Sequence, residues 1–190
     1  MNDCAAEFFS AVAAAIKEAA CTQEGRQIPL NAGVTAFHDA ARKCAEAGRK
    51  VIYIGNGGSA SIASHMSVDL WKNGGIKSQC FNDPSLLTCL ANDLGYEHVF
   101  STPVESFAES GDMVVAISSS GKSANIINAA QTALEKGCLL VTCSGFGPDN
   151  PLRKMGNLNF YVPSRIYGVV ETAHSAICHA VVDCAISCRK

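Results

Sequence analysis

Apolar residues follow two different patterns along this chain, and each pattern predicts a different kind of secondary-structure element. Short continuous apolar runs are typical of strands that are covered on both faces. They lie at 51–54, 113–117 and 138–142, with two further candidate strands at 77–81 and 158–162. Apolar residues at helical spacing predict helices over 1–20, 31–48, 59–72, 85–91, 98–108, 124–136 and 169–188.

The order of these elements predicts the fold class. Strands that alternate with helices indicate an α/β layered fold with a mostly parallel sheet. The chain has 190 residues and no internal repeat or linker, so we expect a single domain, with N-terminal helices in 1–48 and an α/β core in 49–190. The last helix is apolar on more than one face, which suits burial either between subunits or within its own domain.

Composition narrows the class of protein. The chain is 48% hydrophobic and 17% charged, and its net charge of −2 gives no electrostatic reason to bind nucleic acid or an acidic membrane. No apolar run approaches the length of a membrane span, and the N-terminus lacks the basic start of a signal peptide. The ten cysteines form no C-x-x-C pair, which favours free buried thiols and a cytoplasmic protein.

Glycine and serine cluster in two loops that follow predicted strands, GNGGS at 55–59 and SSSGKS at 118–123, with a third loop, CSGFG, at 143–147. Ligands of such sheets bind beyond the carboxyl ends of the strands. Hydroxyls and free N–H groups at a helix start form an anion cradle, and Ser59 is placed to cap the helix after the first loop. Neither loop is a nucleotide fingerprint, and each alone fits a simple turn equally well. Together they favour a site for a small phosphorylated molecule.

Two predicted helices carry acids and imidazoles. His65 and Asp69 are four residues apart on one helix face, and Glu171 and His179 are eight apart on the last helix, close to two turns. If both faces look into one cleft, the set can move protons between carbon and oxygen atoms of a sugar, or bind a divalent metal such as zinc. The alternative is that each residue is structural, with Asp69 paired to Lys72. Periodicity does not decide whether the two helices meet.

Four segments carry a resemblance to a known family: GNGGSASIASHMSVDL, ANDLGYEHVF, AISSSGKSANII and ETAHSAICHAVVD. They resemble the sugar isomerase (SIS) domain and, within it, the phosphoheptose isomerase group. The resemblance implies a three-layer sandwich with a five-stranded parallel sheet and a helical N-terminal extension, and a homotetramer with active sites between subunits. It also implies that sedoheptulose 7-phosphate and D-glycero-D-manno-heptose 7-phosphate interconvert through an enediol.

The resemblance assigns roles to residues of this chain. Asp69 falls at the family's catalytic glutamate and His179 at its catalytic histidine. The positions that bind substrate are Asn56, Gly57, Gly58, Ser59, Asp93, Ser118, Ser119, Ser120, Ser123 and Glu171, where the serines would hold the phosphate. The positions that bind zinc in some members are His65, Asp69, Glu171 and His179.

Three departures from the family pattern stand near these positions. Aspartate stands at position 69 where glutamate is usual, which shortens its reach by about 1 Å. Glu171 replaces the usual glutamine, and Asn73 stands where an arginine is expected. These departures leave two alternatives open: a non-catalytic sugar-phosphate-binding or regulatory protein, and an isomerase of another sugar phosphate.

Overall fold

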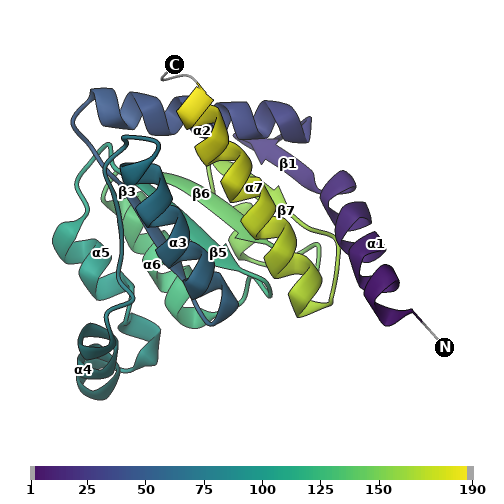
Figure 1. Ribbon diagram of the computed structural model, residues 1–190. Coiled ribbons are helices and arrows are strands. Elements are labelled where there is room, and N and C mark those ends of the chain that lie inside the picture. Colours follow the sequence, from purple (N-terminus) through teal and green to yellow (C-terminus); the bar gives the residue numbers. More distant parts are fainter. Residues whose placement is uncertain (1–2, 188–190) are drawn as a thin grey trace.

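A computed structural model describes residues 3–187, and it places seven strands in one sheet with helices on both faces (Figure 1). The strand order is β2-β1-β7-β6-β5-β3-β4. The strands are β1 (Ala20–Gln23), β2 (Arg26–Ile28), β3 (Val51–Gly55), β4 (Ser78–Cys80), β5 (Met113–Ser118), β6 (Leu139–Ser144) and β7 (Leu158–Tyr161). The α-helices are α1 (Cys4–Lys17), α2 (Leu30–Glu46), α3 (Gly58–Lys72), α4 (Pro84–Leu94), α5 (Ser101–Phe107), α6 (Ala124–Glu135) and α7 (Tyr167–Ser187), with short 3-10 helices η1 (Tyr96–His98) and η2 (Leu152–Lys154).

The five expected parallel strands are present as β3 to β7, which pair parallel throughout. The sheet also has two strands that the sequence did not predict. Residues 20–28 form an antiparallel hairpin of β1 and β2. Strand β1 pairs antiparallel with β7, so the hairpin extends the sheet beyond β7. The expectation that 1–48 holds only helices is therefore wrong. The hairpin turns at Glu24 and Gly25, which both have positive φ, as a tight two-residue hairpin turn requires.

Each central strand is buried on both faces, which explains its continuous apolar run. In β5, Met113, Val115 and Ile117 point into the larger core, under α1, α2, α3 and α7. Val114 and Ala116 point to the opposite face and pack in the second core with α5 and α6. The expected three-layer arrangement is confirmed.

Helix α7 packs into the core of its own domain. Burial between subunits stays a prediction for the part of the helix that this core does not cover. Val169, Val170, Ala173, Ile177 and Val181 all lie in the larger core. The helix is nevertheless 21 residues long and apolar enough to cross a membrane by length and composition, contrary to the expectation that no run approaches that length. Half of that apolar window is buried in the molecule. The expected helix end at position 188 lies outside the described residues.

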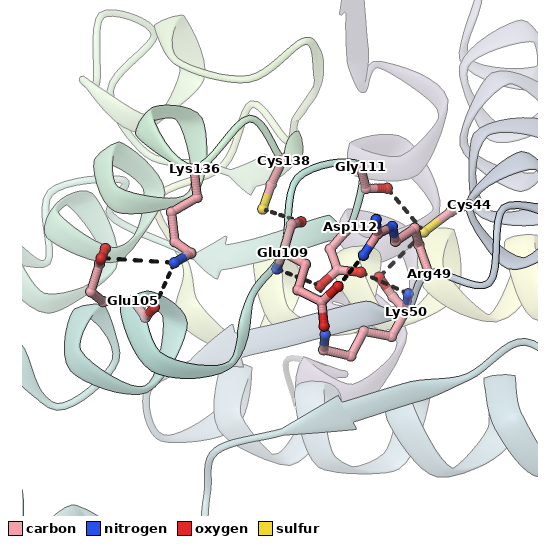
Figure 2. A network of polar contacts seen from close by, with 9 residues as sticks. All are labelled: Cys44, Arg49, Lys50, Glu105, Glu109, Gly111, Asp112, Lys136 and Cys138. Atoms are coloured by element: carbon pink, nitrogen blue, oxygen red, sulfur yellow. Dashed lines mark hydrogen bonds and ion pairs between the residues drawn. The ribbon is translucent and has the colours of Figure 1, made fainter.

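The strand starts are tied together by a network of charges and thiols at the edge of the sheet where β3, β5 and β6 begin (Figure 2). The Asp112 carboxylate is fully buried and accepts hydrogen bonds from Lys50 Nζ at 2.6 Å, Lys50 N at 3.0 Å and Glu109 N at 2.8 Å. Burial alone would raise the pKa of Asp112, but these bonds and the Lys50 charge outweigh it and hold the pKa below its ordinary value. Arg49 pairs with Glu109 at the rim. Every polar group named here has a partner.

The nine cysteines that the structure describes are all free thiols, as expected. Five of them are buried, and burial raises the pKa of both Cys21 and Cys44 to about 11. The Cys44 and Cys138 thiols donate to carbonyl oxygens in the network just described. Such thiols stay protonated and act as small apolar residues with a weak donor. Cys4 and Cys89 are exposed.

Candidate active site

The serine loop leaves β5 and leads into α6, and it keeps its hydroxyls close to the start of that helix. Ser118 and Ser119 are buried, and Gly121 N donates to Ser118 Oγ at 3.2 Å. The Ser119 hydroxyl is buried and has no hydrogen-bond partner among the described residues. Ser123 is the N-cap of α6, yet its side chain makes no cap hydrogen bond within the described chain. A buried hydroxyl without a partner costs free energy, so this loop has hydrogen-bonding capacity left for a ligand.

The glycine loop leaves β3 and leads into α3. Gly57 is the N-cap of α3 with a φ of 53°, which glycine adopts without strain. Helix α3 begins at Gly58, so the expectation that Ser59 caps it is wrong, because Ser59 already lies inside the first turn and is buried. In residues 3–187 no side chain caps α3. Backbone N–H groups in its first turn are therefore left without a side-chain acceptor.

Both loops line one cavity of about 250 Å³, which we call the serine-lined cavity. Its wall brings together nine of the ten residues expected to bind substrate, with Tyr167 from the start of α7 and Ile117 from β5. The nine are Asn56, Gly57, Gly58, Ser59, Ser118, Ser119, Ser120, Ser123 and Glu171. Two helix starts and several hydroxyls converge here without a lysine or arginine in the wall. This chemistry suits a phosphate group held by neutral donors.

The tenth residue, Asp93, does not belong to the wall of this cavity. It is exposed on α4, and its carboxylate accepts a hydrogen bond from Asn92 Nδ2 at 2.8 Å. In Figure 1, α4 lies below the rest of the molecule, at the end of the sheet where the two loops lie. The structure of the single chain therefore does not bring Asp93 to the serines.

Helices α3 and α7 pack against each other and bring the acid–imidazole set together, which periodicity alone left open. His65 Nε2 lies 3.2 Å from Asp69 Oδ2, and the His65 and His179 ring centroids are 5.4 Å apart. Ligand atoms of His65, Asp69 and His179 all lie within 4.8 Å of one another. Asp69 pairs with His65 and accepts a hydrogen bond from Asn73 Nδ2 at 3.2 Å, in place of the alternative pairing with Lys72.

Glu171 lies apart from these three residues. Its carboxylate rests against Gly58 at the start of α3, where a Cβ on residue 58 would clash with it. It lines the serine-lined cavity and also a groove of about 410 Å³ between α3 and α7, whose other wall residues include Ile62, Ser175 and His179. Glu171 and Gly58 thus belong to the walls of both the cavity and the groove.

Comparison with known proteins identifies the family to which this fold belongs. The family model described as "SIS domain" matches residues 7–145. The chain belongs to the SIS-domain family. It is 35% identical to the phosphoheptose isomerase of Fusobacterium nucleatum over 142 residues, which covers 72% of each chain. Among solved structures, phosphoheptose isomerase from Neisseria gonorrhoeae is 28% identical with a TM-score of 0.80, covering 95% of this chain and 94% of that one. The enzyme from Francisella tularensis has the same fold, with a TM-score of 0.84 at 24% identity and 97% coverage of both chains.

Three residues of this SIS domain that line or support the site were not foreseen from the sequence. Asn125 in the first turn of α6 exchanges two hydrogen bonds of 2.9 Å with Asn56, and the Tyr96 hydroxyl donates to Asn56 Oδ1 at 3.0 Å. Asn125 stood in a quoted segment, but its partner is 69 residues away. The third is His174, three residues after Glu171 on α7.

His174 lies fully buried under the loop that follows β6. Its Nε2 bonds Ser144 O at 3.0 Å, while its Nδ1 has no partner in the described chain. Desolvation by burial lowers the pKa of His174 to about 4, against the smaller opposing effect of the Ser144 carbonyl. The ring is therefore neutral at physiological pH and acts as a support of the third loop of this SIS domain.

Proposed function

We propose that this chain is an aldose–ketose isomerase that converts sedoheptulose 7-phosphate to D-glycero-D-manno-heptose 7-phosphate through an enediol. One observation carries the proposal: the serine-lined cavity and the α3–α7 groove, whose wall includes His179, lie side by side and share the wall residues Gly58 and Glu171. An anion site and a proton-transfer site are thus adjacent. Relatives named phosphoheptose isomerases, 33% to 36% identical to this chain, support the same reaction class.

The distance along the groove favours a long sugar. Glu171 and His179 are eight residues apart on α7, which at about 1.5 Å per residue corresponds to about 12 Å. Side chains lean toward the helix N-terminus, so His179 reaches back along the groove. An open seven-carbon chain with a terminal phosphate has a length of this order. A phosphate held at the serines would place the other end of such a chain at Asp69 and His179.

Asp69 and His179 are the proposed proton-transferring pair. In the ketose, a proton leaves C1 and the C2 carbonyl oxygen gains one, which gives the enediol. The O1 hydroxyl then loses its proton as C2 receives one, so the product is an isomer and no atom is gained or lost. The Asp69 carboxylate suits the carbon-bound proton and the His179 imidazole suits the oxygen-bound ones. Binding of the remote phosphate supplies energy that orients the reacting carbons.

The donor set at the end of the groove fits a divalent metal. Two imidazoles and one carboxylate, within 4.8 Å of one another, match the three protein ligands of an open catalytic zinc site. Zinc is therefore the proposed ion, held by His65, Asp69 and His179. Glu171, the fourth residue expected to bind the metal, lies against Gly58 and outside this group. Such an ion, when bound, would polarise oxygen atoms of the sugar.

The remaining expectations also stand as proposals. Exposed apolar side chains support a homotetramer with active sites between subunits, since Phe9, Trp71, Tyr167 and Phe107 are each more than half exposed. Asp93 would then reach a substrate only if it lies in a neighbouring subunit or moves with α4. Free thiols support a cytoplasmic location. A net charge of −2 gives no support for nucleic-acid or membrane partners.

The test follows hydrogen at the sugar carbons. Purified protein of known metal content is incubated with sedoheptulose 7-phosphate in heavy water, and NMR follows deuterium entry and aldose formation. We expect both in the wild type and neither in Asp69→Asn. The matched control is Asp39→Asn, which alters another carboxylate at 3.2 Å from an imidazole, that of His38 on α2. It should keep full activity.

Two results would contradict the proposal in different ways. Protection against heat by sugar phosphates without any exchange would make the chain a sugar-phosphate-binding or regulatory protein. Exchange with a pentose or hexose phosphate, but not with the heptose, would support the aldose–ketose isomerase reaction and contradict the proposed heptose substrate.

A further inference from the structure

We propose that Asn125 is a positioning residue of the phosphate site, because its carboxamide fixes the distance between the two loops that form the serine-lined cavity. The inference rests on the proposed function, since it assigns a role to Asn125 in binding the substrate's phosphate. Asn125 itself does not line the cavity.

The β-ladder that aligns the two loops ends too early to position them. Strands β3 and β5 pair as far as Gly55 with Ile117. Every loop residue expected to hold substrate lies beyond that pair, at 56–59 on one side and at 118–123 on the other. Past the ladder, the Asn56–Asn125 pair is the one side-chain hydrogen-bonded link between residues 56–59 and 118–125 that the described chain contains.

The pair is built as a closed ring of two hydrogen bonds. Asn56 Nδ2 donates to Asn125 Oδ1 and Asn125 Nδ2 donates to Asn56 Oδ1, each at 2.9 Å. Asn125 is only 2% exposed, so an unpaired carboxamide there would be costly, and its orientation is held by Asn56. Asparagine side chains near a helix start often bond the local backbone, whereas Asn125, two residues after the N-cap Ser123, reaches across to another loop.

Tyr96 extends the link to a third segment. Its hydroxyl also donates to Asn56 Oδ1, so this oxygen has two donors and Asn56 has one N–H left for a ligand. Helix α6 also contacts η1, the short helix that contains Tyr96, through a second bond: Asn128 Nδ2 donates to Glu97 O at 3.0 Å. Asn125 and Asn128 are three residues apart and share a face of α6. The face therefore positions both the glycine loop and η1.

The geometry of anion binding makes this spacing matter. Hydrogen bonds to a phosphate hold only over a few tenths of an ångström around 2.8 Å, and donors from both loops must reach one group. A shift of about 1 Å can lower a catalytic rate by about 100-fold. A link that sets loop separation is thus expected to act on ligand affinity without touching the ligand.

The test uses two near-isosteric variants and sulfate, a phosphate mimic whose charge does not change between mildly acid and neutral pH. Asn125→Leu removes the ring without adding charge and should weaken sulfate binding about tenfold or more at every pH. Asn125→Asp places two oxygens face to face at neutral pH and should weaken binding similarly. Once protonated, the introduced carboxyl can donate to Asn56 Oδ1 and rebuild the ring. Burial raises the pKa of such a carboxyl, so recovery is expected by about pH 5.

Gln131→Glu is the matched control, because it adds the same charge six residues along α6, where the exposed Gln131 side chain donates to Glu135 of the same helix. Its sulfate affinity should stay within about twofold of wild type, with no recovery in acid. A role in stability alone would lower the melting temperature of the Asn125 variants without changing their dissociation constants. Wild-type affinity in Asn125→Leu, or Asn125→Asp that stays weak at low pH, would overturn the inference. Failure of the wild type to turn over the heptose while it still binds sulfate would overturn the proposed function alone.

Discussion

The two edges of the parallel sheet differ in how completely they satisfy their own polar groups. At the edge where the strands begin, the buried Asp112 carboxylate has three donors, and nearby thiols have carbonyl partners (Figure 2). At the edge where the strands end, Ser119 Oγ is buried without a partner in the described chain and lies in the wall of the serine-lined cavity. A polar group satisfied internally stabilises the fold, whereas one left open is available to a ligand. Substitutions should therefore cost stability at the first edge and activity at the second.

The largest expected effect is the loss of turnover at the second edge. Asp69→Asn and His179→Ala should each lower kcat by about 10²- to 10⁴-fold, because general acid–base transfer contributes on that scale. Both residues are partly exposed, so the melting temperature should change little. Steady-state assays and thermal denaturation measure the two effects. A variant that unfolds would break the contrast between the edges.

Asp112→Ala should have the largest effect on stability. It leaves Lys50 and two N–H groups without their acceptor and should lower the free energy of unfolding by about 3 kcal/mol. Turnover measured well below the melting temperature should stay close to wild type. Urea denaturation measures the loss. Glu109→Gln is the control, since its pair with Arg49 is exposed and should contribute less than about 1 kcal/mol.

Acid should act on the two edges in sequence. The pKa of His174 is about 4 when folded and near 6.5 when unfolded, so the unfolded chain binds more protons between these values. Stability from His174 is present above pH 6.5 and falls by up to about 3 kcal/mol as the pH drops to 4. The pKa of Asp112 lies below 3.8, so its contribution is complete above 3.8 and is lost only below that pH.

His174→Gln should flatten the upper part of this profile and leave the lower part intact, as measured by unfolding at a series of pH values. An unchanged slope between pH 6.5 and 4 would contradict the assignment to His174.

The smallest expected effect, that of Ser119→Ala, separates ligand binding from stability most clearly. Ser119→Ala removes a donor to a charged ligand, which is worth about 1.5 kcal/mol or slightly more, and should raise KM about tenfold. Because the hydroxyl has no partner in the described chain, its removal should not lower the melting temperature. Ser106→Ala, which removes an exposed hydroxyl bonded to Thr102 O, should change neither quantity.

The sequence predicted the elements that a continuous pattern defines and missed those that depend on distant partners. The apolar runs located β3, β5 and β6, and the glycine and serine loops located the cavity. The β1–β2 hairpin was missed because strands of four and three residues carry little periodic signal. The Asn56–Asn125 pair joins positions 69 apart, and no local pattern reports such a contact.

Glu171 shows the limit of counting along a helix. Eight residues along a helix rotate the side chain by about 80° more than two full turns, and they span about 12 Å along the axis. The two side chains therefore share a groove without sharing a ligand position. By contrast, the four-residue spacing of His65 and Asp69 gave a contact of 3.2 Å. Helix packing, which the sequence left open, then supplied His179.

The outlying position of α4 has a consequence for motion. None of its residues is buried, and its apolar side chains only border the second core. Such a segment opens by local fluctuation at far lower free energy than a central strand. Amide hydrogens of α4 should exchange with heavy water well before those of β5, and bound substrate should slow that exchange if Asp93 closes over it.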